Sequence, residues 1–174
     1  QREYYATHQY FLTKRSLYLV MWKVTDGEKG VNDIMQWLVN IQARAPNAPV
    51  VIVGTHLDQV TKRKYPATYL QDLQQLIRAK YMCHSEPEKW GLPRVLHHIE
   101  ISCRPKLMSN SHIGELVNLV FTVACEEQMP GSKGVRLIEQ KVPATYVQLQ
   151  DVVYDLAAER KNDGKDPVLH AEQY

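Results

Sequence analysis

The sequence predicts an α/β protein with an open, mostly parallel sheet and helices on both of its faces. Three short apolar segments, at 17–24, 50–54 and 95–101, alternate with segments whose apolar residues recur at helical spacing. Strands that are joined through helices run parallel, by right-handed crossovers. Three strands make a small sheet for such apolar sequences. We therefore expect an upstream part of the sheet to be missing from this chain.

Composition places the chain among globular proteins. It has 174 residues, of which 44% are hydrophobic and 23% charged, and its net charge is +2. No apolar run reaches the ~20 residues of a membrane helix, and we expect no transmembrane segment and no signal peptide. The charges are interspersed, which argues against nucleic acid as a partner. Three cysteines at no regular spacing favour reduced thiols. These observations predict a cytoplasmic protein and leave peripheral membrane association open.

The first two strands carry the strongest signals. The segment LYLVMWKV at 17–24 is apolar at almost every position and ends at Asp26-Gly27, which predicts a strand buried on both faces. VVIVG at 50–54 follows Pro49 and predicts a second buried strand. VLHHIEI at 95–101 predicts a third strand, on weaker evidence.

Four helices are predicted from apolar residues at helical spacing. The first runs to Pro46, the second lies before the loop at 85–93, and the third precedes a composition change at 129–134. The fourth lies within 142–161. Their apolar positions are, in order, Val31, Ile34, Met35, Leu38, Ile41 and Ala45; Tyr69, Leu70, Leu73, Leu76, Ile77 and Tyr81; Ile113, Leu116, Val117, Val120 and Ala124; and Tyr146, Leu149, Val152, Val153 and Leu156.

Polar residues that directly follow the second strand are the first candidates for a binding site. Thr55, His56 and Asp58 come after VVIVG, where open α/β sheets place ligand-contacting side chains. A carboxylate there can accept two parallel hydrogen bonds from a fork of N–H groups, such as guanine N1 and N2. The alternative is that Asp58 only caps the turn that follows. Ser102 and Cys103 occupy the equivalent place after the third strand, where their backbone amides could meet a ring carbonyl oxygen.

Other groupings of reactive side chains are weaker. Cys83-His84, His97-His98 and Cys103 fit no zinc spacing, and adjacent histidines on a strand point to opposite faces. We therefore predict no metal site within this chain.

The order of the elements resembles the second half of a Ras-type GTPase, in which an N/T-K-x-D motif and an S-A-like motif hold guanine. A closer resemblance is to the Roc domain of the ROCO family, in particular the leucine-rich-repeat kinases. It rests on YYATHQYFLTKRSLYLV, on WLVNIQARAPNAPVVIVGTHLD and on VPATYVQL, which resembles the opening of the COR domain. The resemblance implies a Ras-like P-loop GTPase fold whose N-terminal half is missing here. Residues 1–128 would be the C-terminal part of Roc, 129–141 a linker and 142–174 the start of COR.

The same resemblance implies roles for single residues. Asp58 would read the guanine edge, Thr55 would brace the loop, and His56 would lie where a lysine stem usually covers the base. Ser102 and Cys103 would form a second clamp on the base. Gln1 would orient the attacking water, within a segment, 1–16, that senses the γ-phosphate; an ordinary amphipathic helix is the alternative for that segment.

Two features depart from the family pattern. The chain contains neither G-x-x-x-x-G-K-S/T nor D-x-x-G, so the groups that hold phosphates and Mg²⁺ are expected upstream. A histidine at position 56 in place of lysine predicts weaker, faster-exchanging nucleotide.

The sequence is compatible with two functions, an enzyme and an interaction module. The first is a GTP-hydrolysing part of a ROCO-type serine/threonine kinase, inactive alone, that binds GTP or GDP and dimerises through COR. The second is a non-catalytic interaction or dimerisation module that keeps the Ras-like shell.

Overall fold

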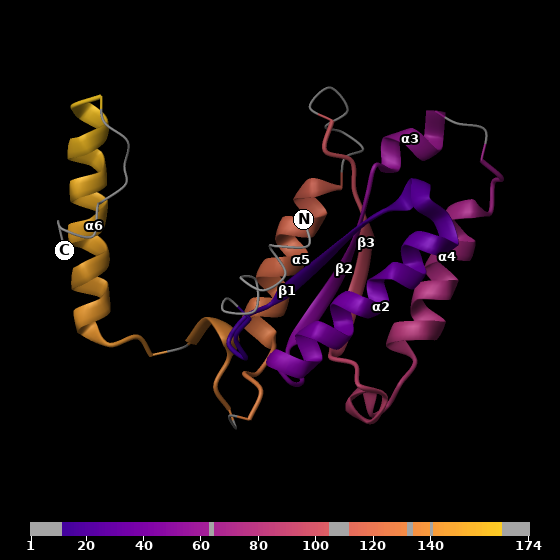
Figure 1. The fold of residues 1–174 in the computed structure, drawn as a ribbon, viewed down its shortest axis with the longest axis horizontal. Helices are drawn as coiled ribbons and strands as arrows, with labels where there is room; N and C mark the ends of the chain where they lie inside the picture. Colours follow the sequence, from indigo (N-terminus) through magenta and orange to yellow (C-terminus); the bar gives the residue numbers. More distant parts are fainter. Residues whose placement is uncertain (1–11, 63–64, 105–111, 132–133, 140, 165–174) are drawn as a thin grey trace. The chain divides into compact units, whose positions relative to one another are not determined.

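The computed structural model divides the chain into two compact units, Gln1–Glu139 and Gln140–Tyr174, and each is described by itself. The elements of both units are drawn in Figure 1. The residues that the structure describes are 12–62, 65–104, 112–131, 134–139 and 141–164.

The first unit is built on a parallel sheet of three strands, β1 (Tyr18–Lys23), β2 (Pro49–Thr55) and β3 (Arg94–Glu100), in the order β1-β2-β3. The predicted α/β class, the parallel direction and all three strand positions are confirmed. Because every strand runs the same way, the carboxyl ends of all three lie at one edge of the sheet.

Helices cover both faces, as predicted. On one face lie α2 (Gly27–Arg44) and α4 (Tyr69–Ile77), whose buried residues join those of the strands in the main core (Figure 1). On the other face, Leu116 and Leu119 of α5 (Ile113–Glu126) pack against Val51 and Val53. A short helix, α3 (Leu57–Lys62), follows β2 directly.

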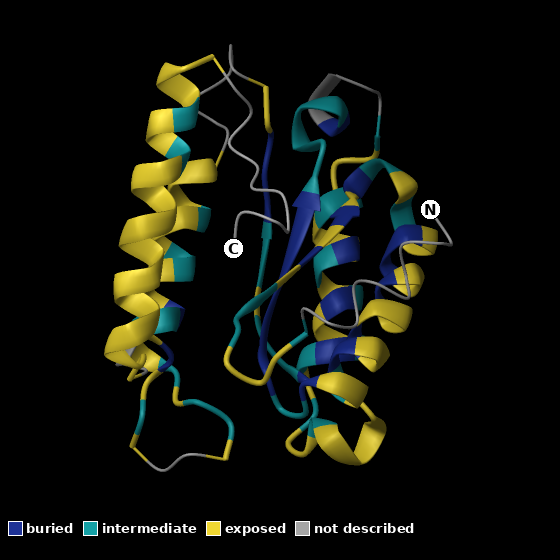
Figure 2. Cartoon of the chain, turned by 60° about the vertical axis from the view of Figure 1, so that its left-hand side comes forward, coloured by how far each residue is buried: buried dark blue, intermediate teal, exposed yellow. Residues whose placement is uncertain are grey.

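The core forms where the alternating side chains of β2 meet these helices. Six of the seven β2 residues are buried, and they are coloured dark blue at the centre of Figure 2. Val50 and Ile52 belong to the cluster on the α2 side, and Val51 and Val53 to the cluster on the α5 side. Strand side chains alternate between faces, so one apolar run serves both helical layers.

The predicted second helix ends in a distorted turn. After Ile77 the chain continues as a π-helix, η3 (Arg78–Met82), and this keeps Tyr81 on the buried side at 2% exposure. The Tyr81 hydroxyl donates to the Val31 carbonyl of α2 at 2.7 Å. Burial raises the pKa of this phenol above its ordinary value, which further favours the protonated hydroxyl that donates this bond. The bond ties η3 to α2.

The expectation that the first strand is buried on both faces is wrong. Val20 and Trp22 are buried toward α2, whereas Leu19 is 42% and Met21 50% exposed on the other face. Within the described residues β1 is an edge strand, with β2 as its strand neighbour. Helix α5 packs against β2 and leaves these two β1 side chains uncovered. Continuous apolar sequence does not reveal which face a helix will cover.

The side chains that marked the third helix are only partly buried. Helix α5 turns Leu116, Leu119 and Val123 inward, while Val117 is 60% and Phe121 64% exposed. Apolar residues extend around much of this helix, so spacing alone could not identify the arc that contacts the sheet.

Further short elements complete the first unit. A 3-10 turn, η2 (Val24–Asp26), joins β1 to α2, and another, η4 (Pro87–Trp90), precedes β3. After α5, Gln128 and Arg136 form an antiparallel bridge, and the turn η6 (Leu137–Glu139) begins with the buried Leu137. The second unit contains α6 (Ala144–Asn162), which confirms the fourth predicted helix and has no buried residue.

Candidate functional site

The polar turns after β2 and β3 meet at the carboxyl edge of the sheet. The Ile101 amide donates to the Gly54 carbonyl at 2.7 Å, and the Leu57 amide donates to the Ile101 carbonyl at 3.2 Å. These bonds extend the pairing of β2 and β3 into the turns. As a result Ser102 lies in one site with Thr55 and Asp58, although it is 44 residues from Asp58 in the sequence.

Thr55 and His56 shape the turn after β2. The Thr55 hydroxyl donates to the Trp22 carbonyl of β1 at 2.9 Å, and its oxygen also lies 2.9 Å from His56 Nδ1. Since the single hydroxyl proton goes to Trp22, His56 Nδ1 carries the hydrogen of the second contact. His56 has φ 65°, a left-handed conformation that is uncommon outside glycine, and it turns the chain from β2 into α3. These contacts hold the turn, and the brace proposed for Thr55 stays a prediction.

Asp58 lies in the first turn of α3, and its side chain is only 9% exposed. Ser102 Oγ donates to Asp58 Oδ1 at 3.1 Å, and Arg104 Nε lies 3.5 Å from Oδ2. A carboxylate that is held by a neighbouring hydroxyl in a poorly hydrated place can accept a paired N–H fork from a ligand.

The remaining predicted residues fall in different surroundings. Ser102 is 2% exposed and its Oγ also accepts from the Arg104 amide at 3.4 Å. Cys103 follows with an exposed, free thiol. Gln1 lies outside the described residues, as does most of the segment 1–16.

Gly54 is enclosed by buried side chains directly before the site. A Cβ at this position would lie 2.8 Å from Val24 Cγ2, 3.0 Å from Glu100 Cγ and 3.3 Å from Trp22 Nε1. Val24 is fully buried, so it has no open space into which it can move. The absence of a side chain at Gly54 is what allows β1, β2 and β3 to approach at this edge.

We expect Gly54→Ala to lower the free energy of unfolding by ~1–3 kcal/mol, because the added methyl overpacks this buried contact. Urea unfolding followed by tryptophan fluorescence measures the change. Gly114→Ala is the matched control, since nothing lies within 4 Å of its added Cβ and α5 gains a better helix former. Equal stability of the two variants would contradict the packing argument.

Two features of the site were not predicted from sequence. No sequence pattern singled out Arg104, yet its side chain reaches Asp58. Glu100 is buried at 9%, where Gln74 Nε2 donates to its Oε2 at 2.7 Å and His98 Nδ1 lies 3.4 Å from its Oε1. A charged residue at the end of an apolar strand was the signal that could have identified Glu100.

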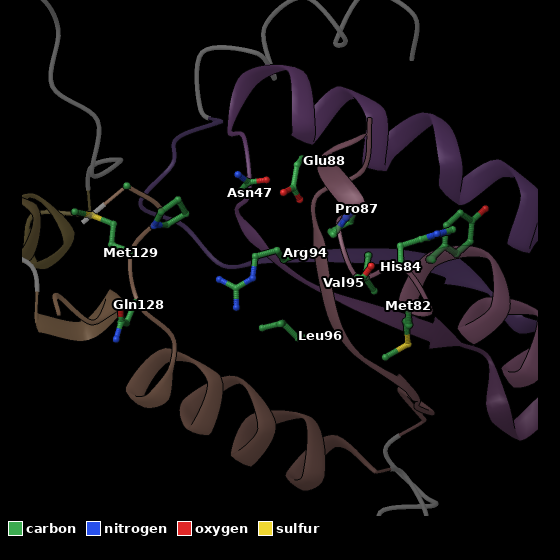
Figure 3. Close-up of a pocket in the computed structure, with 14 residues that line it drawn as sticks. Asn47, Met82, His84, Pro87, Glu88, Arg94, Val95, Leu96, Gln128 and Met129 are labelled. Atoms are coloured by element: carbon green, nitrogen blue, oxygen red, sulfur yellow. The ribbon is translucent and has the colours of Figure 1, made fainter. Parts of the chain in front are cut away.

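A separate cavity of about 720 Å³ lies at the other end of the sheet. Its lining includes Asn47, which precedes β2, and Arg94, which begins β3 (Figure 3). Arg94 Nη2 donates to Glu127 Oε2 at 2.5 Å. None of Thr55, Asp58 or Ser102 is among the lining residues of this cavity. It is therefore distinct from the candidate site.

Within the described parts of the chain, no three His, Cys, Asp or Glu side chains gather as a metal ion would require. The helices of those parts include none with the length and apolar character needed to cross a membrane.

Comparison with known proteins places the chain in a family. Residues 1–58 match the family described as "Ras of Complex, Roc, domain of DAPkinase". The chain is 41% identical over 176 residues to leucine-rich repeat serine/threonine-protein kinase 1 of Caenorhabditis elegans, which covers 100% of the chain and 7% of that protein. The protein of the same name from Mus musculus is 33% identical, over 95% of the chain and 8% of its own length.

A third relative, the probable serine/threonine-protein kinase pats1 of Dictyostelium discoideum, is 47% identical over 62 residues, which is 36% of the chain and 2% of that protein. The chain thus spans under a tenth of the length of these relatives. The parallel sheet and these matches agree with one another. The chain belongs to the Roc family, the Ras-like domain of ROCO-type leucine-rich-repeat kinases.

Proposed function

We propose that this chain supplies the base-recognition part of a Roc domain that binds and hydrolyses GTP. The observation that carries the proposal is Asp58, a 9% exposed carboxylate that meets the buried Ser102 at the carboxyl edge of a parallel sheet. This edge is where open α/β sheets bind ligands. Asp58 would accept hydrogen bonds from guanine N1–H and the exocyclic amine.

The other site residues would support that contact. Thr55 would hold the turn by its bond to the Trp22 carbonyl, and the imidazole of His56 would lie against the base. The turn at Ser102 and Cys103 would meet the ring carbonyl through backbone amides. Ser102 would also fix Asp58, because its hydroxyl donates to the carboxylate.

Phosphate and Mg²⁺ binding would come from residues outside this chain. The sequence has no G-x-x-x-x-G-K-S/T loop, and the relatives are more than ten times longer. When bound, Mg²⁺ would neutralise charge on the phosphates during attack by water. Among the described residues, those of the candidate site would contact the base and not the phosphates, so the base contacts can be tested separately from hydrolysis.

The domain assignment follows from the same relationship. We propose residues 1–128 as the C-terminal part of Roc, 129–141 as a linker and 142–174 as the start of COR. The parent protein would be a cytoplasmic serine/threonine kinase that signals as a homodimer held by COR, with peripheral membrane association left open.

Titration of a fluorescent GDP analogue into the intact parent protein tests the proposal, with the matching adenine nucleotide as the control ligand. Guanine should bind at least about tenfold more tightly than adenine, because adenine presents an acceptor at N1 where guanine presents N–H. Equal affinity for both bases, or no binding, would favour the non-catalytic interaction module instead.

In the intact parent protein, Gln1→Leu is expected to slow GTP hydrolysis several-fold while GDP affinity stays unchanged. The side chain would contact the attacking water and not the bound nucleotide, so its loss acts in the transition state. Single-turnover hydrolysis measures the rate, and GDP titration is the accompanying control. An unchanged rate would remove Gln1 from the mechanism.

A further inference from the structure

We infer that Arg104 is a built-in competitor for the base site: its guanidinium pairs with the Asp58 carboxylate and must leave before guanine binds. This inference rests on the proposed function of Asp58. The motifs described above give Arg104 no role.

Two side chains from the turn after β3 contact the Asp58 carboxylate. Ser102 Oγ donates a hydrogen bond to Oδ1, and Arg104 Nε forms an ion pair with Oδ2 at 3.5 Å. Each carboxylate oxygen accepts about two hydrogen bonds, so Ser102 can remain when a ligand arrives. A guanidinium beside Oδ2 is larger and charged, and it stands where a second ligand donor has to approach.

Guanine and arginine offer similar N–H groups to a carboxylate. The Watson–Crick edge of guanine presents N1–H and an amine on the same carbon. Arginine presents the same arrangement, two N–H groups fixed on one planar carbon. A carboxylate that recognises the first also attracts the second, and Arg104 has the additional attraction of a full positive charge.

The exposure of Arg104 shows why this contact can be released. Its side chain is 60% exposed, whereas that of Asp58 is 9% exposed. The 3.5 Å separation is longer than the 2.7–2.9 Å typical of a tight charged hydrogen bond. Arg104 can therefore turn into solvent without opening the core, while Asp58 stays in place.

The consequence is a reduced fraction of binding-competent protein. Apparent affinity falls in proportion to the fraction of molecules whose site is free. The pair is long and its Arg104 side chain is largely exposed to solvent, so removing it should raise apparent affinity about two- to sixfold. The gain should appear in the association rate alone, since Arg104 is displaced once the nucleotide is bound.

Stopped-flow binding of a fluorescent GDP analogue to the intact parent protein tests this inference. Arg104→Ala should raise the association rate about two- to sixfold and leave the dissociation rate unchanged. Arg104→Lys keeps the positive charge but lacks the planar pair of N–H groups. Its association rate should therefore lie between those of wild type and Arg104→Ala. Added salt should shrink the difference between Arg104→Ala and wild type, because it screens the ion pair.

Arg94→Ala is the matched control, since it removes the same charge at the opposite end of β3 and should change neither rate. A faster dissociation in Arg104→Ala would show that Arg104 contacts bound nucleotide, and unchanged rates would show no competition; either result overturns the inference. If wild type prefers guanine and Arg104→Ala changes neither rate, the competitor role of Arg104 is overturned and the proposed function is not. Absence of guanine preference in wild type overturns the proposed function as well.

Discussion

Asp58→Asn in the intact parent protein is expected to lower GTP affinity at least about tenfold and to make xanthosine triphosphate the preferred nucleotide. The amide presents one acceptor and one donor, which leaves part of the guanine edge mispaired at a site where the wild-type side chain is 9% exposed. An unsatisfied buried partner typically costs ~1–3 kcal/mol, and more where charge is involved. Xanthine has a carbonyl in place of the guanine amine, and the new amide N–H can donate to it.

Competition of both triphosphates against labelled GDP, in wild type and variant, measures this reversal. Asp72→Asn is the control, because it removes a carboxylate charge from an exposed position of α4. If Asp58 acted only as a helix cap, asparagine would replace it with little loss and the base preference would not change. Equal weakening for both bases would likewise show that Asp58 does not read the base.

Leu38→Ala is expected to lower the free energy of unfolding of the first unit by ~2–5 kcal/mol. Leu38 is fully buried in α2 and belongs to the main core cluster with Val20 and Ile52 of the sheet. Truncation removes apolar contact and leaves a cavity that the neighbouring strands cannot fill. All three tryptophans, at 22, 37 and 90, lie in this unit, so their fluorescence follows its unfolding in urea.

Val39→Ala provides the comparison for this truncation. Val39 is the next residue in α2 and is 45% exposed, so its truncation should change stability by no more than ~0.5 kcal/mol. A similar loss in both variants would mean that α2 does not pack as described. An unchanged dependence of free energy on urea would show that the surface exposed on unfolding is the same in both.

The regular elements were predictable because their signals are local. VVIVG is short, apolar and bounded by Pro49 and a polar turn, and no other element fits it. Helix α2 was recognisable from residues such as Ile34 and Leu38 at helical spacing, although it begins at Gly27, four residues before the periodic stretch. Helix starts are harder to locate because the first turn contributes few core contacts.

Burial was predicted less well than secondary structure. Leu19 and Met21 have the same apolar character as Val20 and Trp22, yet the two pairs point to opposite faces of β1 and only one face is covered. A strand shows its alternation in sequence only when its two faces differ in polarity. Where both faces are apolar, the neighbouring helix decides which one is buried.

For the candidate site, the sequence alone predicted which turns would carry it, because Thr55, His56, Asp58 and Ser102 directly follow apolar strands that had to be parallel. Only the tertiary structure decided which side chains meet. Asp58 and Ser102 are 44 residues apart, and their hydrogen bond exists because β2 and β3 pair in one register. The contact of Arg104 with Asp58 depends on the same register and on a side-chain rotamer, neither of which leaves a local pattern in the sequence.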